Sequence, residues 1–150
     1  MPSQSFSARS KTVSSPPEVW ARLQVPATWE AISGVEAVEN AEYDGSELVG
    51  FTFHSTAGGR RYEGTAKPGQ RAQNETLEWL IATSEIKGSV QVDIEPSPPG
   101  SDIVVSMRVE SVSMMATFGF PLIAAAIASG FQEAADEFAS RLGSTESDAD

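Results

Sequence analysis

The chain has 150 residues, no cysteine and a formal net charge of −11. This length fits one domain with one modest hydrophobic core. Without cysteine the chain forms no disulfide, no thiolate-ligated metal site and no cysteine nucleophile. The negative charge argues against binding to nucleic acid or to anionic membrane surfaces, because both attract basic patches.

The N-terminal third predicts one strand and two short helices. Ser5–Ser14 alternates in polarity and predicts a strand. Ser15 to Glu18 is typical of a helix start, because Ser15 can cap, proline suits the first helical turn, and Glu18 can accept a hydrogen bond from the Ser15 amide. Pro26 opens a second short helix that runs through Trp29 and Ile32.

From Val35 to Met114 the hydrophobic pattern has a period of two, which predicts strands. Asp, Gly and Pro residues interrupt this pattern at short intervals, which favours antiparallel hairpins. Pro68-Gly69 is one of these interruptions and is expected to end a strand. The predicted strands are Val35–Tyr43, Leu48–Ser55, Arg61–Lys67, Thr76–Thr83, Ser89–Glu95 and Asp102–Met114.

Thr117–Leu142 predicts one long C-terminal helix. Its first half, Pro121 to Ala128, is apolar on every side, whereas its second half is amphipathic. The strands carry their apolar residues on one face, so this helix is expected to cover that face, with its first half over a buried space. The residues predicted on its buried stripe are Ile123, Ile127, Phe131, Ala134, Phe138 and Leu142.

The segment Ser111–Gln132 is uncharged and long enough to cross a bilayer. It contains proline, glycine and several serines and has no flanking basic cluster, so no stable membrane insertion is expected. The N-terminus has no apolar segment typical of a signal peptide, and a cytoplasmic location is expected. We expect one domain over residues 1–142 and a disordered acidic tail over residues 143–150.

Four segments carry a resemblance to a known superfamily. They are Ser15-Pro-Pro-Glu-Val-Trp-Ala21, Trp29 with Ile32-Ser-Gly-Val35, Arg61-Tyr-Glu-Gly-Thr-Ala66, and Gly88-Ser-Val-Gln-Val-Asp-Ile-Glu-Pro96. Over about residues 5–142 the chain resembles START-like (SRPBCC) proteins, the birch-pollen-allergen-like helix-grip superfamily, which includes the polyketide cyclase/dehydrase and lipid transport group. The last two segments look most like the carbon monoxide dehydrogenase G-like proteins. The resemblance implies an α+β helix-grip fold, in which a seven-stranded antiparallel sheet wraps around a long C-terminal helix and an apolar cavity.

Residue types suited to catalysis or metal binding are scarce. His54 is the single histidine and lies in the polar phase of its strand, so it is expected at the surface and no metal or cofactor site is expected. Asp93 and Glu95 share a strand face, but that face is the wet one, which favours solvation over paired acid–base chemistry.

The candidate ligand cavity consists of apolar residues on the dry face and on the final helix. Ordinary core packing explains any one of them equally well, although Tyr62 and Trp79 each carry a polar group that needs a partner or could orient a ligand. Ala125 and Ala126 are small enough to leave space, and about 100° separates neighbouring helix positions, so one of the two is expected to face inward. The cavity candidates are Phe51, Phe53, Tyr62, Trp79, Val92, Val105, Met107, Phe118, Ile123, Ala126 and Ile127.

These observations predict binding, transport or sequestration of a small hydrophobic ligand, lipid-like or polycyclic. The alternatives implied by the resemblance are a cyclase or dehydratase acting in the cavity, and an accessory protein for assembly of a molybdenum hydroxylase. Inward-facing charge is scarce in the pattern, which weighs against the enzyme. A homodimer is compatible with the sequence.

Overall fold

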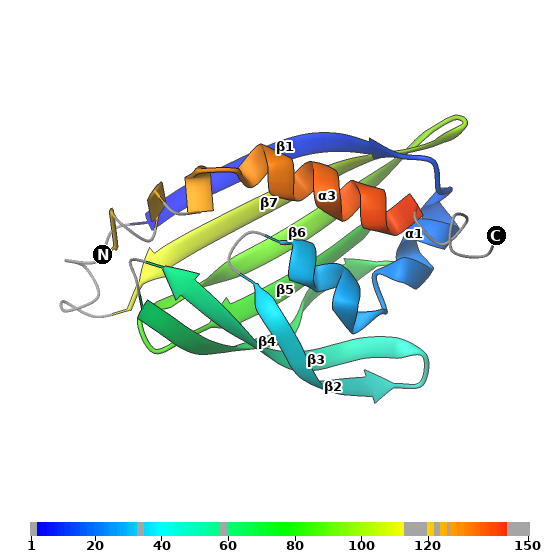
Figure 1. Ribbon diagram of the computed structural model, residues 1–150. Helices are drawn as coiled ribbons and strands as arrows, with labels where there is room; N and C mark the ends of the chain where they lie inside the picture. The colour runs from blue at the N-terminus through cyan, green and yellow to red at the C-terminus, as the bar shows by residue number, and fades with distance from the viewer. Residues whose placement is uncertain are drawn as a thin grey trace.

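The computed structural model describes residues 3–32, 35–57, 60–112, 120, 121, 124, 125 and 127–143. These residues form one antiparallel sheet with helical segments on one of its faces (Figure 1). The elements are β1 (Ser3–Thr12), α1 (Pro16–Arg22), the 3-10 helix η1 (Pro26–Ala31), β2 (Glu36–Asp44), β3 (Glu47–Ala57), β4 (Arg60–Ala72), β5 (Thr76–Ala82), β6 (Ile86–Ser97), β7 (Gly100–Ser111) and α3 (Phe131–Gly143).

The sheet has seven strands in the order β1-β7-β6-β5-β4-β3-β2. Strands β2 to β7 pair with their neighbours in sequence, as short hairpins require, and β1 closes the order by pairing with β7. Helix α3 lies along β1 and reaches η1 (Figure 1). The predicted α+β helix-grip fold, with seven antiparallel strands and a C-terminal helix, is therefore confirmed.

Strand β4 departs from the prediction. Pro68-Gly69 does not end it, and the strand continues to Ala72. Its pairing with β5 instead shifts at this point. Pro68 lies opposite Trp79 and Arg71 lies opposite Leu77, so β4 has two residues between these pairs where β5 has one. Proline and glycine inside a strand mark such a β-bulge as readily as they mark a turn. The expected turn at Pro68-Gly69 was wrong for this reason.

The C-terminal helix is interrupted rather than continuous. The described residues before residue 129 include helical positions such as Ile127, but a turn at Ser129 and Gly130 separates them from α3. Gly130 has φ +85°, a conformation that side chains disfavour and that helices use at their ends. The expectation of one helix over Thr117–Leu142 was therefore wrong within the described part of the chain. No helix in that part is long and apolar enough to cross a membrane.

The buried stripe of α3 also differs by one position from the prediction. Phe131, Phe138 and Leu142 are buried as expected, but Ala135 is buried where Ala134 was expected, and Ala134 is only half-buried. Ile127 and Phe131 are both buried and lie four residues apart, as the prediction had them. The difference lies within α3, where the position four residues after Phe131 faces the core rather than the position three residues after it, and Ala139 is buried as well. The expected acidic tail lies outside the described residues except for Gly143, which ends α3.

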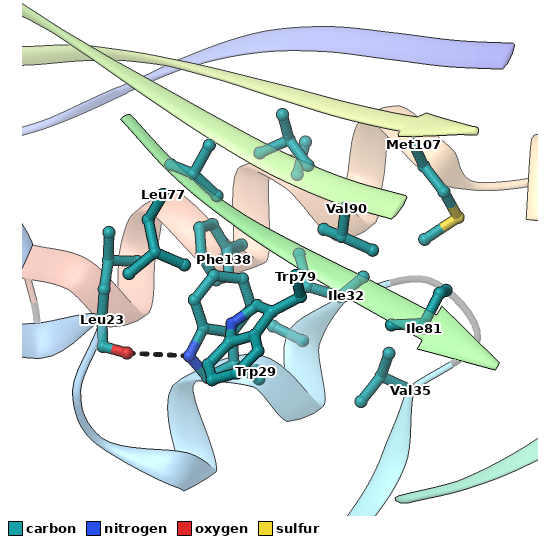
Figure 2. Packing of buried hydrophobic residues seen from close by; sticks show 14 of the residues in the cluster. Leu23, Trp29, Ile32, Val35, Leu77, Trp79, Ile81, Val90, Met107 and Phe138 are labelled. Atoms are coloured by element: carbon teal, nitrogen blue, oxygen red, sulfur yellow. Dashed lines mark hydrogen bonds between the residues drawn. The ribbon is translucent and has the colours of Figure 1, made fainter. Parts of the chain in front are cut away.

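The hydrophobic core centres on aromatic rings next to α1. The Trp29 ring centroid lies 5.9 Å from that of Trp79 and 5.2 Å from that of Phe138. Phe51 adds a fourth ring, 4.9 Å from Trp79. Trp29 donates a hydrogen bond from Nε1 to the Leu23 carbonyl at 2.9 Å, so its one polar group is satisfied in the core (Figure 2). This cluster fills the interior at the end of the sheet that carries α1.

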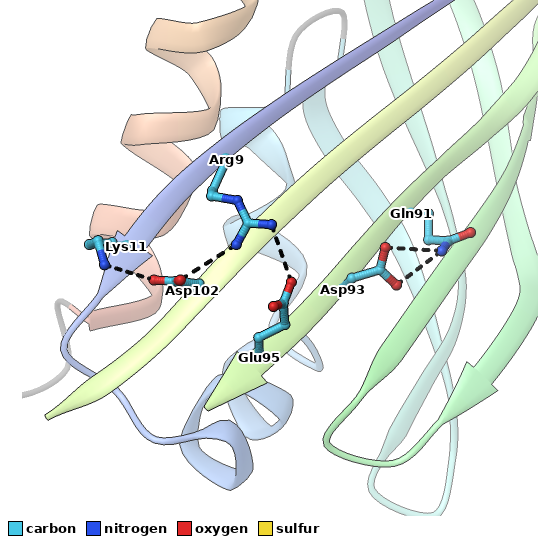
Figure 3. A network of polar contacts seen from close by, with 6 residues as sticks. All are labelled: Arg9, Lys11, Gln91, Asp93, Glu95 and Asp102. Atoms are coloured by element: carbon cyan, nitrogen blue, oxygen red, sulfur yellow. Dashed lines mark hydrogen bonds and ion pairs between the residues drawn. The ribbon is translucent and has the colours of Figure 1, made fainter. Parts of the chain in front are cut away.

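The opposite face of the sheet is polar. Arg9 lies 3.4 Å from both Glu95 and Asp102, and Lys11 lies 3.1 Å from Asp102 (Figure 3). Exposed ion pairs of this kind contribute about 0–1 kcal/mol each. The face therefore supports solubility and register more than stability, as the alternation of the strands predicts.

Candidate ligand pocket

An apolar pocket lies inside the sheet, at the end away from α1. It is formed by residues near the C-terminal ends of β3, β5 and β7, by the first residue of β6, by Val35 before β2, and by Ile127 from the helical segment before α3. Figure 2 shows Val35, Ile81 and Met107 on one side of the core and Leu23 and Leu77 on the other. The aromatic cluster thus separates the pocket from α1. The lining residues are Val35, Phe53, Ser55, Ile81, Ala82, Thr83, Ile86, Met107, Val109 and Ile127.

Two hydroxyl groups contribute to this lining. Thr83 Oγ1 accepts hydrogen bonds from the amides of Glu85 at 3.2 Å and Ile86 at 3.1 Å, so it is engaged in the β5–β6 turn. Ser55 is half-buried, and its hydroxyl has no hydrogen-bond partner in the part of the chain that the structure describes. The pocket wall is therefore mainly carbon with one available polar group, which is typical of a site for a largely apolar ligand.

The space inside the pocket is small. The described walls leave about 20 Å³, which is room for about one water molecule. A larger ligand therefore has to displace part of the wall. Met107 is suited to this, since an unbranched methionine side chain adapts to irregular shapes.

Eight of the eleven predicted cavity residues divide into three groups. Phe53, Met107 and Ile127 line the pocket. Tyr62 is half-buried, and its hydroxyl donates to Glu85 Oε2 at 3.4 Å. Four others are buried in the core, and whether any of them contacts a ligand stays a prediction; they are Phe51, Trp79, Val92 and Val105.

The remaining candidates fall on the final helix. Phe118, Ile123 and Ala126 lie outside the described residues. Ala125 is exposed, so it does not point into the pocket. Ala124, which the sequence did not single out, is half-buried and packs against the core.

The titratable residues considered from sequence lie away from the pocket. His54 Nε2 is 3.3 Å from Glu39 Oε1 on the edge strand β2. Asp93 accepts hydrogen bonds from Thr76 Oγ1 at 2.7 Å and Gln91 Nε2 at 3.0 Å on the polar face (Figure 3). Within the described ranges no three His, Cys, Asp or Glu residues gather as a metal site would require.

Sequence reasoning missed some lining residues and one inward-facing charge. Ser55 was missed because a lone serine in a strand carries no chemical signal, and Val109 because it was counted with the general apolar phase. Arg71 was missed because the bulge in β4 changes which residues face inward, and only the Pro68-Gly69 pair in the sequence marks that change.

Comparison with known proteins identifies the fold class. No protein-family model matches the chain, and no curated protein matches it. TTHA0849 from Thermus thermophilus superposes with TM-score 0.70 at 11% identity, covering 94% of this chain and 97% of that one. The Zhui aromatase/cyclase from a Streptomyces species superposes with TM-score 0.69 at 11% identity, covering 99% of this chain and 97% of that one. A START superfamily protein from Mycobacterium smegmatis superposes with TM-score 0.60 at 12% identity, covering 87% of this chain and 94% of that one.

At these identities the likeness establishes the fold and nothing finer. The chain has the START-like helix-grip fold, as its sequence segments indicated. The likeness to the carbon monoxide dehydrogenase G-like proteins has no counterpart among these structures.

Proposed function

We propose that the protein binds a small, mostly apolar ligand, lipid-like or polycyclic, between the pocket end of the sheet and the helical segment before α3. The observation that carries this proposal is the carbon-lined pocket with the Ser55 hydroxyl, which has no hydrogen-bond partner among the described residues. A ligand would gain free energy by removing apolar surface from water, at about 25 cal/mol per Å². The Ser55 hydroxyl would orient its one polar end.

Catalysis of the cyclase or dehydratase type is the second candidate. One contact supports it, since the Tyr62 hydroxyl donates to the Glu85 carboxylate beside the pocket residue Ile86. A phenol and a carboxylate in contact can pass a proton to or from a substrate. An accessory role in molybdenum hydroxylase assembly rests on the sequence resemblance alone, and the identity of neighbouring genes would test it.

Binding is tested in two ways. Native mass spectrometry of the purified protein should show a co-purified small molecule, and a neutral apolar fluorescent dye should brighten on addition of the protein. Ser55→Val narrows the pocket and removes the hydroxyl, so it should weaken dye binding. The matched control is Thr56→Val, because Thr56 is the next residue of β3 and is exposed.

If the protein carries no small molecule and both variants bind the dye as the wild type does, the pocket is not the binding site. Loss of dye binding in Ser55→Val alone, with the unfolding midpoint unchanged, supports the proposal.

A further inference from the structure

The bulge in β4 brings a charged side chain to the inner face of the sheet. Tyr62, Gly64 and Ala66 face inward, and strict alternation would continue this phase to Gln70 and place Arg71 outside. In the observed pairing Arg71 instead lies opposite Leu77, which is fully buried. Residues directly opposite each other in antiparallel strands share a face, so Arg71 faces inward.

Interactions of Glu78 with both bulged residues hold this geometry. Glu78 Oε1 accepts a hydrogen bond from the Gln70 amide at 3.0 Å. The same Glu78 carboxylate occupies the space next to Gly69 and would have to move to admit a side chain there. The inward position of Arg71 is therefore built into the strand.

The guanidinium of Arg71 is largely desolvated, and none of the described residues accepts a hydrogen bond from it. Its side chain is 14% exposed, and its Cζ lies 4.7 Å from the centroid of the Trp79 ring. Nε, Nη1 and Nη2 are all buried and have no hydrogen-bond acceptor among the described residues. Burial lowers the pKa of Arg71, and the charge of Glu47 opposes this shift. Glu47 Oε1 lies 3.7 Å from Nη1, beyond hydrogen-bond distance.

Arg71 belongs to the wall of a surface groove of about 850 Å³ at the α1 end of the sheet, opposite the apolar pocket. One side of the groove is apolar and comes from α1, namely Pro17, Trp20 and Ala21. The other side comes from the β2–β3 and β4–β5 turns and includes Glu47. The groove thus combines a flat apolar wall with a guanidinium whose donors have no hydrogen-bond acceptor in the described part of the chain.

We propose that this groove binds a small monocarboxylate, whose carboxylate replaces Glu47 beside Arg71 and whose apolar body packs on Trp20. The planar guanidinium fork matches a carboxylate with two parallel hydrogen bonds, which would satisfy buried donors that otherwise cost free energy. A single negative charge is favoured over a phosphate dianion because Glu47 is adjacent and the chain has a net charge of −11. Glu47 is 50% exposed, so it can turn into solvent and vacate the position.

The test follows the Arg71 Nε–H signal of the full-length protein by NMR, with sodium benzoate as probe and benzamide as its neutral counterpart. Benzoate should shift this signal in a saturable manner, and benzamide should not. Glu47→Gln should tighten benzoate binding, because it removes the competing charge. Arg71→Gln should weaken it by about tenfold or more, as expected for loss of hydrogen bonds to a charged group. Arg108→Gln is the matched control, since Arg108 has a 59% exposed side chain on the polar face.

Three results would overturn the proposal. The first is an Arg71 signal that benzoate leaves unchanged, which would mean that water satisfies the Arg71 donors. The second is inorganic phosphate that binds as tightly as benzoate. The third is weaker benzoate binding in Glu47→Gln than in the wild type. The signal and the Glu47 variant decide the matter even if Arg71→Gln fails to fold. The neutral dye reports on the apolar pocket independently, so failure of one site does not imply failure of the other.

Discussion

Gly64 on β4 lies directly opposite Phe53 on β3, and the phenyl ring of Phe53 occupies the space that a side chain at Gly64 would need. A Cβ at this position would overlap three atoms of the ring. The glycine therefore leaves room for the tip of the Phe53 ring against β4, and Phe53 in turn forms part of the pocket wall.

Gly64→Ala should push the Phe53 ring into the pocket. We expect it to lower the free energy of unfolding by about 1–3 kcal/mol, as for other overpacked cores, and to weaken binding of the neutral dye. Urea unfolding and dye titration measure the two effects. Thr65→Ala, at the exposed neighbouring position, should change stability by less than about 1 kcal/mol. Equal stability of Gly64→Ala and the wild type would show that the ring does not depend on the glycine.

Phe138→Ala should be strongly destabilising, because this residue is fully buried and its ring contacts Trp29. The expected loss is about 3–5 kcal/mol in urea unfolding, and Phe131→Ala should fall in the same range. Ser140→Ala, on the exposed side of α3, should stay within about 0.5 kcal/mol. A loss at Phe138 as small as that at Ser140 would contradict the assigned helix face.

The strands were predictable because one buried and one exposed face impose a two-residue period, and the sequence carries that period from β3 to β7. Two features were not predictable from it. Pro68-Gly69 fits a turn and a bulge equally, and only the pairing with β5 decides between them. The apolar run before Gly130 fits one long helix, yet a single positive φ at Gly130 ends it. Of the predicted cavity residues, Phe53, Met107 and Ile127 line the described pocket, and whether it binds a ligand stays a prediction. Its other lining residues lie mostly near strand ends, which periodicity places poorly.

The cap of α1 makes a pH-dependent contribution to stability. Glu18 Oε1 accepts two hydrogen bonds from Ser15, one from the amide at 2.9 Å and one from the hydroxyl at 2.8 Å. These hydrogen bonds lower the pKa of Glu18 below its ordinary value of 4.5. A lowered pKa stabilises the folded state fully above the unfolded pKa, and this contribution is lost as the pH falls through the folded pKa.

Glu18→Gln should therefore be less stable than the wild type near neutral pH, and the difference should shrink below about pH 4.5. Urea midpoints of both proteins, measured from about pH 7 down to about pH 3, report this convergence. A difference that stays constant over this range would mean that the Glu18 charge has no role in the cap.

Ala125 and Ala126 offer a paired test of the helical segment over the pocket. Ala125 is exposed, so Ala125→Phe should leave dye binding unchanged. Neighbouring positions of an ideal helix differ by about 100° in direction, so the prediction for the inward position now falls on Ala126. Ala126→Phe should abolish dye binding. It should lower the free energy of unfolding by less than the roughly 1–3 kcal/mol that is typical of an overpacked core. Strong destabilisation of Ala126→Phe would show that side chains already fill this space.

The bulge in β4 also determines where the chain can change in length. Elsewhere in a paired strand, loss of one residue turns every following side chain to the wrong face. Between Pro68 and Arg71 the strand holds one residue more than its partner, so deletion of Gln70 would convert the bulge into regular pairing and leave Arg71 opposite Leu77. We therefore expect some homologous chains to lack one residue at this point of β4. Chains with and without this residue should both keep the inward-facing arginine.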